Sequence, residues 1–234
     1  MNAQDFHKLV HVVLDSEAAP PANLFIKGYD DWHARARLAH FLAMPELKHL
    51  DDAIELFRSV VEIEIDEENA EDIEEKVYAL QKLSFIRRDQ KDYEAALKYI
   101  NLAVETAESS DFLYKYILRG ELWADRWNLL HLKGEDKEAE QEVDERIAAF
   151  EDIPIHFNSY LYYGYRFKAQ LAAEREVPLV AKDYMHMALK YVDLPANNKA
   201  DIDDAFKQTH ANISWILNAI DRAMPPLEHL NWDI

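Results

Sequence analysis

The chain has 234 residues, a formal net charge of −19 and no cysteine. The lack of cysteine excludes disulfides, thiolate zinc sites and cysteine nucleophiles, and the strongly negative charge argues against binding to nucleic acid or to an anionic membrane surface. Its four glycines are too far apart to form a phosphate-binding loop, which argues against nucleotide cofactors held in that way.

The start of the chain gives an expectation about location. Residues 1–7 lack the basic start and apolar core of a secretory signal. No apolar run approaches the ~20 residues that a membrane span needs. We therefore expect a cytoplasmic protein that does not bind membranes or nucleic acid.

Apolar residues at helical spacing predict several helices in the first half of the chain. In the first of them, residues 3–14, Phe6 and Leu9 share one face. Asp30 or Asp31 can cap the second helix, because a side-chain oxygen at this position accepts from a free backbone N–H. The ranges expected after the first helix are 32–43, 49–65, 70–88 and 92–109.

The second half of the chain continues in the same way. Gly134 can take the left-handed conformation that ends a helix, and Pro154 can open the next one. The alternating residues 61–65 are interpreted as a helix end rather than a strand. The helices expected here cover 111–133, 136–150, a stretch beginning at Pro154, 178–193 and 201–223. The sequence thus predicts an all-α protein of about ten helices.

Small residues recur along the chain at a fixed interval. Ala53, Ala96, Ala139 and Ala181 follow one another at intervals of 43, 43 and 42 residues. Each of them lies in the second helix of an expected helix pair, where two helices approach closely. A constant interval of this size is typical of an α-helical repeat array.

The clearest repeat resembles the tetratricopeptide repeat. Large, small and aromatic residues follow one another here in that family's order: Leu80, Leu83, Ser84, Asp92, Tyr93, Ala96, Ile100 and Ala103. The resemblance covers roughly residues 32–192, although its interval is longer than the family's usual ~34 residues. It implies a right-handed α-α superhelix and one domain over residues 1–234, with helices 3–14 and 201–223 as caps.

The resemblance also implies a concave groove lined by the first helix of each pair. By repeat phase, the groove residues are Tyr78, Gln81, Phe85, Arg88, Glu121, Asn128, His131, Tyr163, Arg166 and Gln170. Such a mixture can hydrogen-bond an extended peptide, and an arginine can hold a carboxylate through two bonds. The alternative interpretation is that these are ordinary solvated residues and aromatic core.

A protein- or peptide-binding adaptor is the function that the resemblance favours. A peptide-responsive regulator is a sharper version of it, and an acidic inhibitor or immunity-type protein that caps a basic partner is another alternative. The acidic run at 62–75 is interpreted as a solvated helix start, with a recognition patch as its alternative.

An enzyme is the hypothesis from a different class, but no nucleophile motif supports it. His7, His11 and Asp15 share one helix face yet are too few to predict a metal site. We expect no enzyme activity, no metal and no cofactor.

Overall fold

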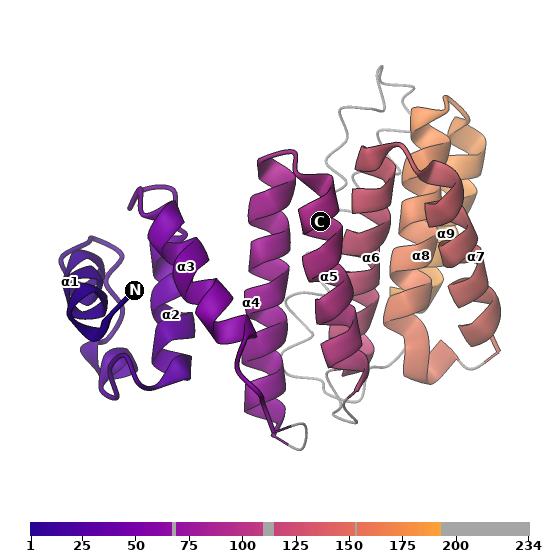
Figure 1. Ribbon diagram of the computed structural model, residues 1–234. Helices are drawn as coiled ribbons and strands as arrows, with labels where there is room; N and C mark the ends of the chain where they lie inside the picture. The colour runs from indigo at the N-terminus through magenta and orange to yellow at the C-terminus, as the bar shows by residue number, and fades with distance from the viewer. Residues whose placement is uncertain (67–68, 110–114, 153, 193–234) are drawn as a thin grey trace. The chain divides into compact units, whose positions relative to one another are not determined.

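A computed structural model describes residues 1–66, 69–109, 115–152 and 154–192, and the regular structure within these ranges is helical (Figure 1). In chain order the elements are α1 (Ala3–Leu14), the short 3₁₀ helix η1 (Ala22–Phe25), α2 (Trp32–Leu42), α3 (Leu50–Val61), α4 (Ala70–Asp89), α5 (Tyr93–Glu108), α6 (Lys115–Lys133), α7 (Asp136–Phe150), α8 (Pro154–Glu174) and α9 (Pro178–Val192). The all-α expectation is confirmed. The right-handed superhelix stays a prediction, and the expected helix 201–223 lies outside the described residues.

Helix starts follow the capping rules. Four helices begin after a residue whose side-chain oxygen accepts a hydrogen bond from a backbone N–H of the first turn. These residues are Asn2 before α1, Asp31 before α2, Asn69 before α4 and Asp92 before α5. The choice between Asp30 and Asp31 is thereby settled in favour of Asp31. Helix α3 ends at Val61, four residues earlier than expected, and residues 62–65 are not helical.

A left-handed residue precedes each of four helices. Lys48, Lys91, Gly134 and Glu176 have φ angles of 56°, 61°, 87° and 58° and come just before α3, α5, α7 and α9. At the last three, the N–H groups of this residue and of its successor bond the last carbonyls of the preceding helix, which is the Schellman motif. The four positions are 43, 43 and 42 residues apart. The backbone turns thus recur at the interval of the alanines.

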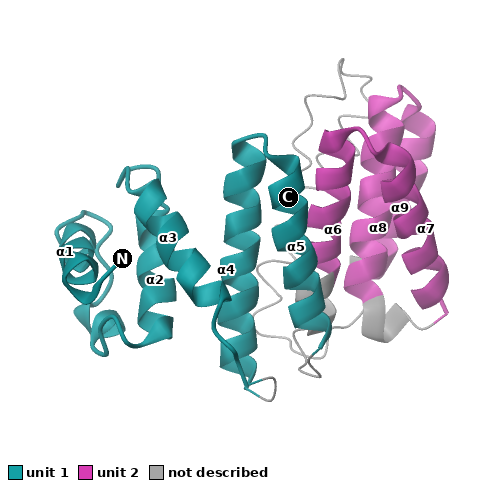
Figure 2. Ribbon diagram, viewed as in Figure 1, with its two compact units in different colours: residues 1–111 teal, residues 112–234 magenta. Residues whose placement is uncertain are grey.

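The helices form two compact units, residues 1–111 and 112–234 (Figure 2). In the first unit, the core around α1, α2 and α3 contains Phe6, Leu38 and Phe57, all fully buried. Helix α4 packs closely on α5, where the buried hydroxyl of Ser84 donates to the carbonyl of Ala96 at 2.9 Å. The small residue predicted at a close helix contact therefore lies in one.

The second unit has an aromatic core. Trp127, Tyr160, Phe167 and Tyr191 are each at most 2% exposed. Helix α7 packs on both α6 and α8, and α9 packs on α8. At Gly120 of α6, an added Cβ would lie 2.7 Å from the backbone of Ser159, so α6 and α8 approach closely there. Aromatic side chains thus make up much of the core of this unit, although Trp123 is only half-buried.

We predict that Gly134→Ala lowers the free energy of unfolding by ~1 kcal/mol, because an L-residue pays that cost in the left-handed region. A Cβ at this position would meet nothing within 4 Å, so the whole effect is conformational. Glu176→Gly, at the equivalent turn of the same unit, is expected to raise stability by ~0.5 kcal/mol. Urea unfolding of both variants measures the two changes, and effects of the same sign would contradict the prediction.

Candidate functional site

Helices α6 and α8 run parallel, side by side. Gly120 near the start of α6 faces Ser159 near the start of α8, and His131 near the end of α6 contacts Glu174 at the end of α8. Because both contacts advance in the same direction along the chain, the two helices point the same way. Equivalent positions on them can therefore form one continuous face.

Polar side chains occupy that face at spacings of three or four residues, which places them on one side of each helix. We call this set the α6–α8 polar face: Glu121, Asp125, Asn128 and His131 on α6, with Tyr163, Arg166, Gln170 and Glu174 on α8. It contains the six residues that sequence reasoning assigned to a groove in this unit. Asp125 and Glu174 were missed, although the same helical spacing could have found them.

The first group on the face surrounds Arg166. This side chain is only 8% exposed, and its guanidinium carbon lies 5.3 Å from the centre of the Tyr163 ring. Burial raises the pKa of Glu121, and the charge of Arg166 opposes that rise. Burial, together with the negative charge of Glu121, also raises the pKa of Tyr163. The arginine expected to hold a ligand carboxylate thus lies within the field of the chain's own glutamate.

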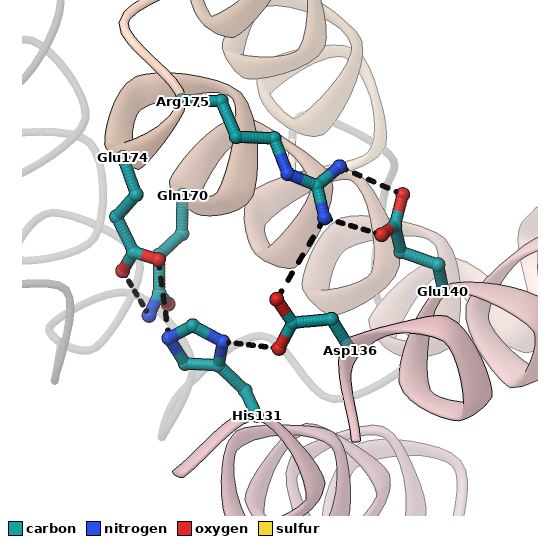
Figure 3. A network of polar contacts seen from close by, with 6 residues as sticks. All are labelled: His131, Asp136, Glu140, Gln170, Glu174 and Arg175. Carbon is teal, nitrogen blue, oxygen red and sulfur yellow. Dashed lines mark hydrogen bonds and ion pairs between the residues drawn. The ribbon is translucent and has the colours of Figure 1, made fainter. Parts of the chain in front are cut away.

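The second group is centred on His131 and is drawn in Figure 3. Its Nδ1 lies 2.8 Å from Asp136 of α7 and its Nε2 lies 3.1 Å from Glu174 of α8. Gln170 donates to the same Glu174 at 3.1 Å. The hydrogen bond with Glu174, followed by that with Asp136, outweighs partial burial and raises the pKa of His131 to about 9. The imidazolium therefore joins the end of α6 to α7 and α8.

Arg175 extends this network along α7. Its guanidinium pairs with Glu140 through two hydrogen bonds, one of 3.0 Å, and approaches Asp136 at 3.9 Å. The bond with Arg175 lowers the pKa of Glu140. Asp136 thus faces one cation from α6 and one from the turn that follows α8. The end of the polar face is fixed by ion pairs rather than left for a ligand.

We predict that the second unit loses stability as the pH rises from about 6.5 to about 9. The folded pKa of His131 lies above its unfolded value, so its contribution is complete below the unfolded pKa and disappears as the pH passes the folded one. Urea unfolding across this range, with an NMR titration of the His131 ring, measures both quantities. In His131→Gln the unfolding free energy should depend less on pH in this range. An unchanged dependence would contradict the role given to His131.

The four expected groove residues of the first unit lie on α4 and behave differently from one another. Gln81 is 7% exposed and belongs to the packed interior, beside the buried stripe that faces the core. Tyr78, Phe85 and Arg88 are half-buried, and the Arg88 guanidinium carbon lies 4.9 Å from the centre of the Phe85 ring. Lys82, whose ammonium lies 6.0 Å from the same ring centre, was missed by sequence reasoning.

Charged residues of α2 and α4 face one another. The Nε2 atom of His33 lies 3.1 Å from Asp72, a close approach without hydrogen-bond geometry. Burial raises the pKa of Glu75, and the charges of Arg37 and then His33 oppose that rise. Contacts of this kind show that α2 and α4 also run parallel within their unit.

A third pair of titratable residues on α2 and α4 consists of His40 and Lys82. Burial, helped by the positive charge of Lys82, lowers the pKa of His40 to about 4. The imidazole ring packs edge-on against Phe57, with ring centres 5.0 Å apart. His40 is therefore a half-buried, neutral residue at pH 7.

We predict that acid destabilises the first unit through His40. Its folded pKa of about 4 lies below the unfolded value near 6.5, so the contribution is complete above pH 6.5 and is lost as the pH falls. The loss is at most about 3 kcal/mol. Comparing the wild type with His40→Phe by urea unfolding between pH 6.5 and pH 5, before most carboxylates titrate, isolates this term. An equal dependence of the unfolding free energy on pH in the two proteins would refute the prediction.

The described residues contain no group of three or more His, Cys, Asp or Glu side chains arranged to hold a metal ion. Within the same part of the chain, no helix is both long enough and apolar enough to cross a membrane.

Comparison with known proteins identified no relative. No protein-family model matches the chain, and neither a curated protein sequence nor a solved structure does. The tetratricopeptide-like assignment therefore stays a prediction.

Proposed function

We propose that this chain is a non-enzymatic adaptor that binds an extended segment of a partner protein on the α6–α8 polar face. The observation that carries the proposal is the arrangement of half-buried polar side chains along two parallel neighbouring helices. An extended segment has unpaired backbone N–H and C=O groups at each residue, and these need partners when they leave water. Asn128 and Gln170 offer both donors and acceptors at the middle of the face.

Preorganisation supports the proposal. The pairs made by His131 fix the last turn of α6 against α8, and Arg166 is held in a buried position. A face whose side chains are already ordered loses less entropy when a ligand binds. Because both nitrogens of His131 face carboxylates, this histidine is a poor general base, which favours binding over catalysis.

The acidic inhibitor is the competing proposal, and the net charge of −19 is the observation that favours it. Attraction between exposed charges weakens strongly as salt rises, whereas hydrogen bonds made on a half-buried face respond less. Salt dependence therefore separates the two functions. The peptide-responsive regulator shares the polar face with the adaptor and needs a second effector surface in addition.

The test is capture of partners from a lysate of the native cell with two matched variants. Asn128→Ala combined with Gln170→Ala removes the central polar groups of the face. Gln141→Ala is the control, because Gln141 donates to Glu145 on α7 as Gln170 donates to Glu174 on α8, each across four residues.

We expect a specific partner to bind the wild type and the control, and to bind the double variant at least ~10-fold more weakly, the loss of one or two hydrogen bonds. Circular dichroism checks that helicity is unchanged. A partner that both variants retain, but that added salt removes, would replace the adaptor by the acidic inhibitor. Capture of no partner by the wild type would contradict both.

A further inference from the structure

Lys82 differs from the other charged residues of α4 that face α2, because the α2 residue opposite to it carries no opposite charge. His33 faces the carboxylate of Asp72, and the charge of Arg37 acts on the carboxylate of Glu75. At the next pair along the helices, Lys82 of α4 faces His40, which burial keeps neutral. No carboxylate of the described residues forms an ion pair with Lys82, which is exposed.

The helix itself does not explain a cation at this place. Helix α4 ends at Asp89, so Lys82 lies about two turns before its end. The attraction of a helix C-terminus for positive charge falls off within the last turn. The positive charge of Lys82 is therefore uncompensated by the backbone as well.

A second cation lies beside the same aromatic ring. Arg88 and Lys82 both approach Phe85, with the guanidinium carbon and the ammonium nitrogen at 4.9 Å and 6.0 Å from the ring centre. The carboxylate paired with Arg88 is that of its neighbour Asp89, at 3.1 Å, with a side chain 69% exposed. Such a surface pair contributes little and exchanges readily with another carboxylate. We call Lys82, Phe85 and Arg88 the α4 cation face.

The chain around this face is strongly acidic, with 45 acidic and 26 basic residues. Lys82 and Arg88 nevertheless lie beside one ring, and the carboxylate that pairs with Arg88 is the exposed one of Asp89. A ligand carboxylate fits this face, because the guanidinium of Arg88 can bind it through two N–H groups and the ammonium of Lys82 adds a point charge. The ring of Phe85 offers apolar contact to the methylene groups of the ligand side chain.

We propose that the α4 cation face binds an acidic side chain, Asp or Glu, of an extended segment of a partner protein. The proposal depends on the adaptor function for the kind of ligand, a protein segment, but not on the α6–α8 polar face. The proposal gives the partner an acidic residue, which the negative net charge of the chain would not suggest. The acidic chain repels acidic segments at long range, and Lys82 and Arg88 attract a carboxylate that comes close to them.

The test is a direct titration with peptides whose ends are acetylated and amidated, so that side chains alone supply charge. One fluorescent peptide alternates Glu with Ser, and its matched control alternates Gln with Ser. Fluorescence anisotropy measures the binding of each to the wild type, to Lys82→Met with Arg88→Gln, and to Lys98→Met. Lys98 is an exposed lysine of α5 and controls for the loss of one surface charge.

We expect the wild type and Lys98→Met to bind the Glu peptide, the double variant to bind it at least ~10-fold more weakly, and the Gln peptide to bind poorly to all three.

Equal binding of the Glu and Gln peptides to the wild type, or an equal loss of binding in Lys98→Met and in the double variant, would each overturn the proposal. A third peptide, of Gln and Ser with a free C-terminal carboxylate, tests the other source of this group, and binding of that peptide alone would move the assignment to a chain end. Failure here, with partner capture still dependent on Asn128 and Gln170, would leave the adaptor function standing. If the Glu peptide binds as expected but partner capture does not depend on Asn128 and Gln170, recognition lies on α4 alone.

Discussion

The left-handed residue before each second helix is the constraint on which both units depend. At Lys91, Gly134 and Glu176 it reverses the chain within a short turn and satisfies the last carbonyls of the preceding helix. Lys48 instead lies in the longer connection, residues 43–49, between α2 and α3. Because the reversal recurs at 48, 91, 134 and 176, every helix pair begins at the same phase of the sequence. Residues at the same place in successive helix pairs therefore lie at equivalent places in the structure.

That phase relation explains how residues far apart in sequence meet. His131 and Glu174 are separated by one repeat interval and lie on parallel helices, where they form an ion pair. Asp72 and His33, which are 39 residues apart, also meet on parallel helices, α4 and α2 of the other unit. In each unit the charged residues of neighbouring parallel helices largely neutralise one another. The two faces proposed for binding are the places where polar groups remain half-buried or a charge remains unmatched.

Much of the fold followed from the sequence, and the limits have physical causes. Helical periodicity predicted the bounds of α1, and periodicity together with the turn at Gly134 predicted those of α7. The early end of α3 was not predicted, since the acidic residues after Val61 fit a helix as well as a turn. Periodicity placed Gln81 on a groove, whereas its burial depends on neighbouring helices. Lys82 was missed for a related reason, because its significance comes from the neutral histidine opposite, which only tertiary packing reveals.

The two histidines also give the two units opposite responses to protons. His40 is half-buried and neutral, so acid must charge it, whereas His131 makes its ion pairs while it is charged. Mild acid should therefore weaken the first unit before the second, and alkali should weaken the second before the first. A protease added at the two extremes would then cut different halves of the same chain. The pH of the solution thus decides which half of the chain unfolds first.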